Sequence, residues 1–165
     1  MSVLIRPSRD DDVAQLAKIY AHSVETETAS WEDVPPSVAE FDARRRALLG
    51  RAFPYLVAEQ DGKPVGFSYA SDYRTRVGYR FTVENSVYVD PAASGQGVGR
   101  ALLNALIEAC RAQGFHRMIA VIGDSDNRAS IRLHEACGFE MVGVFPEVGF
   151  KFNRWLDSVQ MLRDL

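Results

Sequence analysis

The stretch Ser94–Arg100, which reads SGQGVGR, joins a predicted strand to the most regular predicted helix of the chain. Glycines in such a turn let the main chain approach a ligand closely and point its N–H groups at that ligand. The helix that follows adds a partial positive charge at its N-terminus, and Arg100 adds a full one. The segment therefore predicts a binding site for a pyrophosphate.

The sequence on both sides of this loop indicates an α/β fold. Upstream, Phe81–Val89 alternates apolar and polar residues, as a strand with one buried face does, and Asn85 interrupts the apolar series in a way that suggests a bulge. Downstream, Val98–Gln113 carries apolar residues at helical spacing and is followed by Gly114, a typical helix stop. The loop thus connects a half-buried strand to an amphipathic helix.

The remaining segments predict further strands and helices. Met118–Ile122 is a continuous apolar run, which favours a strand buried on both faces, and Asp61-Gly62 indicates a hairpin. Ser37 and Glu40 form a capping-box pattern before a helix on which we expect Arg44–Arg46 to face solvent. The other predicted elements are strands at Val3–Arg6, Tyr55–Glu59, Pro64–Tyr73, Glu140–Phe145 and Trp155–Leu162, and helices that begin at Asp10–Asp12 and at Asn127.

The composition favours one small domain, which we expect to span residues 1–165. Of the 165 residues, 47% are hydrophobic, and the formal charge of −3 argues against a nucleic-acid binder held by a broad basic surface. No apolar run has membrane-spanning length and no signal-peptide pattern occurs, so we expect a cytoplasmic protein whose partner is a small molecule rather than a nucleic acid or a membrane. Cys110 and Cys137 lack metal-ligand spacing and are expected to be reduced, buried thiols, with no metal site.

Three kinds of ligand site could use a glycine-rich turn of this type. A nucleotide P-loop requires Gly-Lys followed by Ser or Thr, whereas Gly99 is followed by Arg100 and Ala101, which excludes it. A dinucleotide site requires an early βαβ unit and an acidic residue after the next strand. Asp124 has that place, but the glycines fall late in the chain and leave too little sequence for a second half.

The third kind of site is indicated by a resemblance to a known family. Gln96–Arg100 matches the glutamine/arginine-x-x-glycine-x-glycine/alanine loop of the GNAT acetyltransferases, which binds the pyrophosphate of acetyl-CoA. Asn127–Ser130 with Glu135–Phe139 resembles the helix of that superfamily that borders the pantetheine arm. Within the superfamily the chain resembles the phosphinothricin and methionine sulfoximine acetyltransferases, through stretches that cover nearly its whole length. These are Thr28–Glu32, Thr82–Val89, Arg132–Glu135 and Gly149–Phe152 with Arg154–Asp157.

The resemblance implies a GNAT fold, with a mixed sheet of six to seven strands flanked by four helices, and acetyl-CoA as cosubstrate. It implies transfer of an acetyl group to the amine of a small amino-acid-like substrate, and it suggests a homodimer. It also implies that the strand ending at Val89 splays from its neighbour and offers free main-chain groups to the acetyl and pantetheine groups. The cofactor-binding residues it implies are Val87, Tyr88, Val89, Gly95, Gln96, Gly97, Val98, Gly99, Arg100, Asn127 and Ser130.

Two residues are candidates for the chemistry. An amino-acid amine is mostly protonated at neutral pH, so its attack on a thioester needs a base. The resemblance assigns this role to Glu84, which the alternation alone would place in solvent. His134 stands where many GNAT enzymes have a tyrosine that acts as the general acid. The subfamily that the chain resembles also has histidine at this position. His134 could protonate the departing thiolate, line the channel or bond to a main-chain group.

Four further residues, together with Glu84 itself, are candidates for binding the substrate. Arg74, Arg76 and Arg80 cluster before Glu84, and a guanidinium can hold a carboxylate through two parallel hydrogen bonds; the alternative is that they are solvated loop charges. A lone tryptophan is usually in the core, but the resemblance puts Trp31 in the loop that covers the substrate. Two other functions stay open: an acetyltransferase for protein N-termini or polyamines, and a non-catalytic acyl-CoA-binding sensor.

Overall fold

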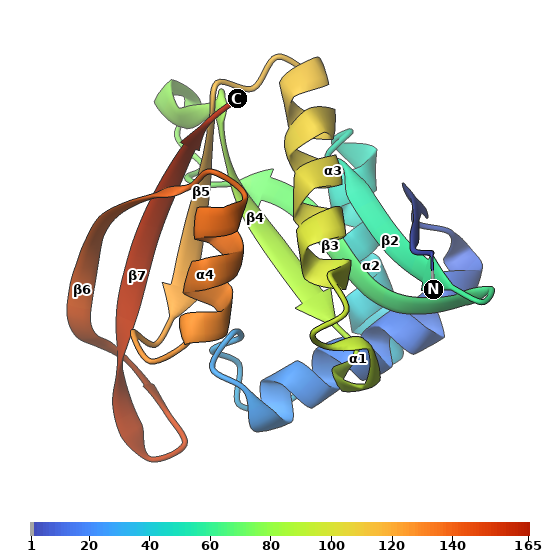
Figure 1. Ribbon diagram of the computed structural model, residues 1–165, viewed down its shortest axis with the longest axis horizontal. Coiled ribbons are helices and arrows are strands. Elements are labelled where there is room, and N and C mark those ends of the chain that lie inside the picture. The colour runs from blue at the N-terminus through green and yellow to red at the C-terminus, as the bar shows by residue number, and fades with distance from the viewer. Residues whose placement is uncertain (1) are drawn as a thin grey trace.

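The computed structural model describes residues 2–165, which form a seven-stranded mixed sheet flanked by four α-helices (Figure 1). The strands are β1 (Leu4–Pro7), β2 (Tyr55–Gln60), β3 (Lys63–Asp72), β4 (Thr82–Val89), β5 (Arg117–Gly123), β6 (Glu140–Lys151) and β7 (Arg154–Asp164). The helices are α1 (Val13–Thr26), α2 (Val38–Gly50), α3 (Val98–Ala112) and α4 (Arg128–Ala136). The predicted fold class is confirmed.

The order of the strands is β1-β2-β3-β4-β5-β7-β6, and β4 with β5 is the parallel pair among antiparallel ones. Their pairing runs from Thr82 with Arg117 to Glu84 with Ile119 and ends there, whereas β4 stays paired with β3 through Val89. Figure 1 shows β4 and β5 diverging toward their C-terminal ends. Beyond Glu84, one edge of β4 therefore has no strand partner.

Apolar side chains fill both faces of the sheet. On one face α3 and α4 cover a cluster that includes Leu103, Leu106 and Met118, none of which is exposed (Figure 1). On the other face α1 and α2 cover a second cluster around Phe67. Strand β4 lies between the two layers, so its successive side chains point alternately into each of them.

Local sequence signals predicted most element ends correctly. Ser37 caps α2 by accepting a hydrogen bond from the N–H of Glu40 at 3.1 Å. Asp61 and Gly62 both have positive φ in the β2–β3 turn, which is the conformation that a two-residue hairpin turn requires. β6 extends to Lys151, beyond the predicted end at Phe145, because its pairing with β7 resumes at Gly149 after a register shift.

Two predictions about the central strands are wrong. The register of β3 with β4 runs without a shift through Asn85, so there is no bulge, and the Asn85 side chain is buried instead. The side of β5 that carries Met118, Ala120 and Ile122 is buried, but on the other side Val121 is 38% exposed, beyond the point where the pairing with β4 ends.

Cys110 and Cys137 are buried and not disulfide-bonded, as predicted. No group of three or more His, Cys, Asp or Glu side chains within residues 2–165 is arranged to hold a metal ion. Among the same residues, no helix has both the length and the apolarity needed to cross a bilayer.

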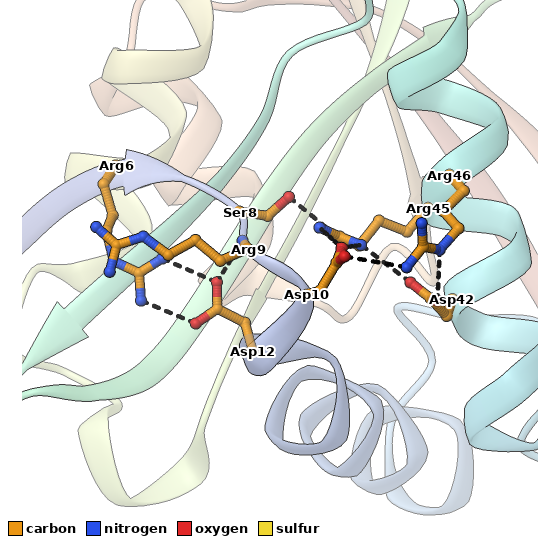
Figure 2. Close-up of polar contacts among 8 residues, drawn as sticks. All are labelled: Arg6, Ser8, Arg9, Asp10, Asp12, Asp42, Arg45 and Arg46. Carbon is orange, nitrogen blue, oxygen red and sulfur yellow. Dashed lines mark hydrogen bonds and ion pairs between the residues drawn. The ribbon is translucent and has the colours of Figure 1, made fainter.

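The expectation that the whole Arg44–Arg46 run faces solvent is also wrong, because the Arg45 side chain is 2% exposed. Its guanidinium donates to Asp10 at 3.1 Å, to Asp42 at 2.9 Å and to Ser8 at 3.1 Å (Figure 2). Arg45 thus joins α2 to the segment before α1. The neighbouring Arg46 pairs with the same two carboxylates but stays 58% exposed.

We expect Arg45→Met to lower the free energy of unfolding by about 1–3 kcal/mol, because it removes buried hydrogen bonds to charged partners. The matched control Arg46→Met loses only solvent-screened ion pairs and should cost less than about 1 kcal/mol. Urea unfolding of both variants measures the difference. Equal losses would contradict a structural role for the buried guanidinium.

Candidate active site

The glycine loop lies between β4 and α3 and presents main-chain N–H groups at the start of that helix. Gly95 and Gly97 have φ of 74° and 82°, a conformation that side chains disfavour, and Gly97 is the N-cap of α3. No atom lies within 4 Å of a Cβ built on either glycine, so the loop faces open space. Val98 begins the helix and is buried, so only its main chain can meet a ligand.

A cleft of about 770 Å³, here called the long cleft, begins at this loop. It runs along the free edge of β4 to the N-terminus of α4, where the Asn127 side chain accepts from the Ser130 N–H at 3.2 Å. All the predicted cofactor-binding residues except Gln96 line it. The Gln96 side-chain amide instead donates to the Ala92 carbonyl at 3.1 Å and so holds the loop to the residues that precede it.

The long cleft is also lined by residues that sequence reasoning did not select, among them Thr28, Ala29, Phe152 and Arg154. Arg154 donates to the Asp124 carboxylate at 2.6 Å across two adjacent strand ends. Their positions follow from the place of β7 beside β5 and from the path of the chain after α1. No local pattern carries that information; only the resembling stretches Thr28–Glu32 and Gly149–Phe152 with Arg154–Asp157 pointed toward this region.

A smaller cavity of about 120 Å³, here called the Glu84 cavity, occupies the gap between β4 and β5. It shares Val87, Asn127 and Ser130 with the long cleft, so the two spaces are contiguous. Glu84 is the last residue of β4 that pairs with β5, and its side chain and that of Asn85 point to opposite faces of the sheet. The gap therefore connects the α3–α4 side of the sheet to the α1–α2 side.

The Glu84 carboxyl has the electrostatics of a base that works near neutral pH. Burial raises its pKa to about 7 from the usual 4.5, because desolvation disfavours the charged form. The positive charge of Arg74 acts in the opposite direction. The carboxyl is therefore partly ionised at neutral pH and, when ionised, accepts a proton more readily than an exposed glutamate does.

His134, on α4, is 5% exposed and lines the Glu84 cavity. Its Nδ1 lies 2.8 Å from the Ser130 carbonyl oxygen, which can only accept a hydrogen bond. Its Nε2 lies 3.0 Å from Oδ1 of Asn85, whose Nδ2 donates to the Ile119 carbonyl at 3.2 Å. Both ring nitrogens thus face acceptor oxygens, and a neutral imidazole, with one N–H, can donate to only one of them at a time. Burial lowers the pKa of His134, which favours this neutral form.

Of the predicted substrate-binding residues, Glu84 lines the Glu84 cavity, whereas the other four lie around the site and line neither the cavity nor the long cleft. Arg74, Arg76 and Arg80 are exposed, and of these Arg74 acts on Glu84 through its charge. The Arg80 guanidinium lies 4.6 Å from the centre of the Phe81 ring and donates to the Val77 carbonyl at 3.1 Å, so it is engaged locally. Trp31 is 39% exposed, and its ring packs on Gly123, which lines the Glu84 cavity.

The comparisons with known proteins agree with this geometry. The model of the acetyltransferase (GNAT) family matches residues 16–139. A phosphinothricin N-acetyltransferase of Alcaligenes faecalis is 53% identical over 161 residues, which cover 98% of this chain and 82% of the relative. An L-methionine sulfoximine/L-methionine sulfone acetyltransferase of Salmonella typhimurium is 44% identical over 161 residues, which cover 95% of this chain and 91% of that protein.

A crystal structure of a phosphinothricin acetyltransferase from Sinorhizobium meliloti in complex with AcCoA has the same fold. It superposes with a TM-score of 0.97 at 43% identity, over 100% of this chain and 89% of that one. The resemblance inferred from the sequence is confirmed. The chain belongs to the GNAT family and is an acetyl-CoA-dependent N-acetyltransferase.

Proposed function

We propose that the enzyme acetylates the amine of a small amino-acid-like substrate such as phosphinothricin or methionine sulfoximine, with Glu84 as the base. The observation that carries this proposal is a carboxyl of raised pKa in a cavity that is contiguous with a glycine-loop cleft. The names of the two relatives support the class of acceptor.

The residues of the long cleft fit acetyl-CoA, which supplies the activated acetyl group. Gly95, Gly97 and Gly99 with Arg100 would hold the pyrophosphate, because open main-chain N–H groups and a helix N-terminus attract anions. The free edge of β4 at Val87–Val89 would pair with the amide groups of the pantetheine arm. Asn127 and Ser130 would border the same arm from α4.

The base and the histidine have different roles in this proposal. Glu84 takes the proton of the acceptor amine, directly or through a water molecule. The two ring nitrogens of His134 contact Ser130 and Asn85, so donating a proton to a thiolate would break one of these contacts. This geometry favours a role in lining the channel and holding Asn85 over a role as general acid.

We expect Glu84→Gln to lower turnover by roughly 10²–10⁴-fold with little change in the affinity for acetyl-CoA. In the parent, turnover should fall as the pH drops through about 7, since protonation removes the base, and the variant should lack this limb. Release of free thiol with methionine sulfoximine as acceptor measures both.

Glu108→Gln, an exposed change on α3, serves as the control. A Glu84 variant with full turnover and an unchanged pH profile would contradict the base assignment. A parent that binds acetyl-CoA but acetylates no amine would favour the alternative of a non-catalytic sensor.

Arg74 is the best placed of the three arginines to hold the substrate carboxylate. We expect Arg74→Ala to raise the KM for the acceptor by about tenfold or more, because it removes a charge-assisted pair, and to leave that for acetyl-CoA unchanged. The acid limb should also move to higher pH, because the charge of Arg74 lowers the pKa of Glu84. Arg76→Ala, at an exposed position, is the matched control. Equal acetylation of the acid and of its decarboxylated analogue would instead favour a polyamine or N-terminal acceptor.

We also propose a homodimer, formed through the apolar surface of the β6–β7 hairpin. Val142, Phe145, Val148, Phe150 and Trp155 are each more than half exposed there, and an apolar patch of this kind usually marks an interface. Light scattering should give twice the chain mass for the parent and one chain mass for Val148→Asp with Phe150→Asp. A monomeric parent would contradict the proposal. A cytoplasmic location stays a prediction.

A further inference from the structure

The loop between α1 and α2, residues 27–37, forms the wall at the junction of the two hollows. Its residue Ala29 lines both the long cleft and the Glu84 cavity. Trp31 follows two positions later, against the end of β5. The position of this loop therefore decides the shape of the space in which an acceptor amine would meet the acetyl group.

Lys151, the last residue of β6, holds this loop through hydrogen bonds to its main chain. It is 2% exposed, and its Nζ donates to the carbonyl of Glu27 at 2.8 Å and to the carbonyl of Ser30. These two carbonyls bracket Thr28 and Ala29. One ammonium group thus fixes both ends of the segment that lines the junction.

Further contacts hold the same segment on the sheet. The hydroxyl of Thr28 donates to the Gly123 carbonyl at 3.0 Å. The Trp31 ring lies so close to Gly149 that a Cβ built there would be 2.5 Å from ring atoms, and a Cβ on Gly123 would also clash with it. The indole therefore sits in a notch formed by two glycines of β5 and β6.

The environment of Lys151 is unusual for a lysine that has only a packing role. Burial of an ammonium group costs free energy unless hydrogen bonds compensate, and lysines are rarely fully buried. Two of its three N–H donors go to one loop, and its Nζ lies 4.8 Å from the centre of the Phe152 ring, which lines the long cleft. The side chain thus contacts both the loop and a residue that lines that cleft.

We propose that Lys151 is a positioning residue that holds the Glu27–Trp31 segment as a preformed wall for the acetyl acceptor. The assignment of the acceptor to this junction rests on the proposed function. Loss of the ammonium frees the segment that carries Ala29 and Trp31, while the glycine loop and the free edge of β4 are untouched. Acceptor binding then weakens more than acetyl-CoA binding does.

The chain has two tryptophans, so Trp155→Phe leaves Trp31 as the only one and makes its fluorescence a probe of the loop. In this background, Lys151→Met should increase acrylamide quenching of Trp31 about twofold or more. It should also raise the KM for methionine sulfoximine by about tenfold, with a smaller change in the dissociation constant of acetyl-CoA, for which the glycine loop and the free edge of β4 stay in place. Lys151→Gln keeps an uncharged N–H donor on a side chain that is one bond shorter, and it should give intermediate values in both measurements.

Lys63→Met is the matched control, because Lys63 is exposed in the β2–β3 hairpin, and it should leave both measurements unchanged. Unchanged quenching in a folded Lys151→Met protein would contradict the proposal that Lys151 holds the loop. If Lys151→Met does not fold, unchanged quenching in Lys151→Gln would contradict it. Increased quenching with an unchanged acceptor KM would overturn the link to acceptor binding. The quenching comparison does not depend on turnover. It therefore tests whether Lys151 holds the loop even if the proposed function is wrong.

Discussion

The separation of β4 from β5 is the constraint on which the rest of the site depends. A parallel pair would normally continue its ladder, because unpaired main-chain groups in the middle of a sheet are costly. Here the ladder stops at Glu84, and the side-chain amide of Asn85 donates to the Ile119 carbonyl at 3.2 Å. A side chain thus takes over a main-chain acceptor at the point of divergence. Nε2 of His134, on α4, contacts the oxygen of the same amide, so α4 helps to fix Asn85 at the point where the two strands separate.

This gap explains how two faces of one sheet can share a reaction. The glycine loop and the α4 N-terminus border the long cleft, whereas Glu84 points to the face that α1 and α2 cover. In an unbroken sheet these side chains would be separated by the backbone. In the proposed arrangement the acetyl group and the amine approach from opposite faces and meet in the Glu84 cavity.

Features determined by neighbours in the sequence could be predicted, and features determined by distant partners could not. The glycine loop, α3 and the Asp61-Gly62 hairpin follow from local turn and helix signals. The bulge predicted at Asn85 is absent, and the polar residue at this position is explained by its contact with His134, 49 positions later. The burial of Arg45 and Lys151 depends on Asp10 and on the carbonyl of Glu27, which the chain brings near only when the sheet is assembled. A charged residue on a helix or at a strand end carries no local signal that such partners exist.

The pKa of Glu84 links acceptor binding to catalysis in the proposed mechanism. A base at the usual pKa of 4.5 would be ionised at neutral pH but would draw a proton from an ammonium group only weakly, and one above about 9 would be protonated already. Burial raises the pKa of Glu84 to about 7, and the charge of Arg74 limits that rise. When an acceptor carboxylate pairs with Arg74, part of that positive charge is neutralised. This weakens one influence that lowers the pKa of Glu84, whereas the ammonium group of the same acceptor brings a positive charge of its own toward the carboxyl. In the proposed mechanism Arg74 therefore acts both on the position of the acceptor and, through its charge, on the basicity of Glu84.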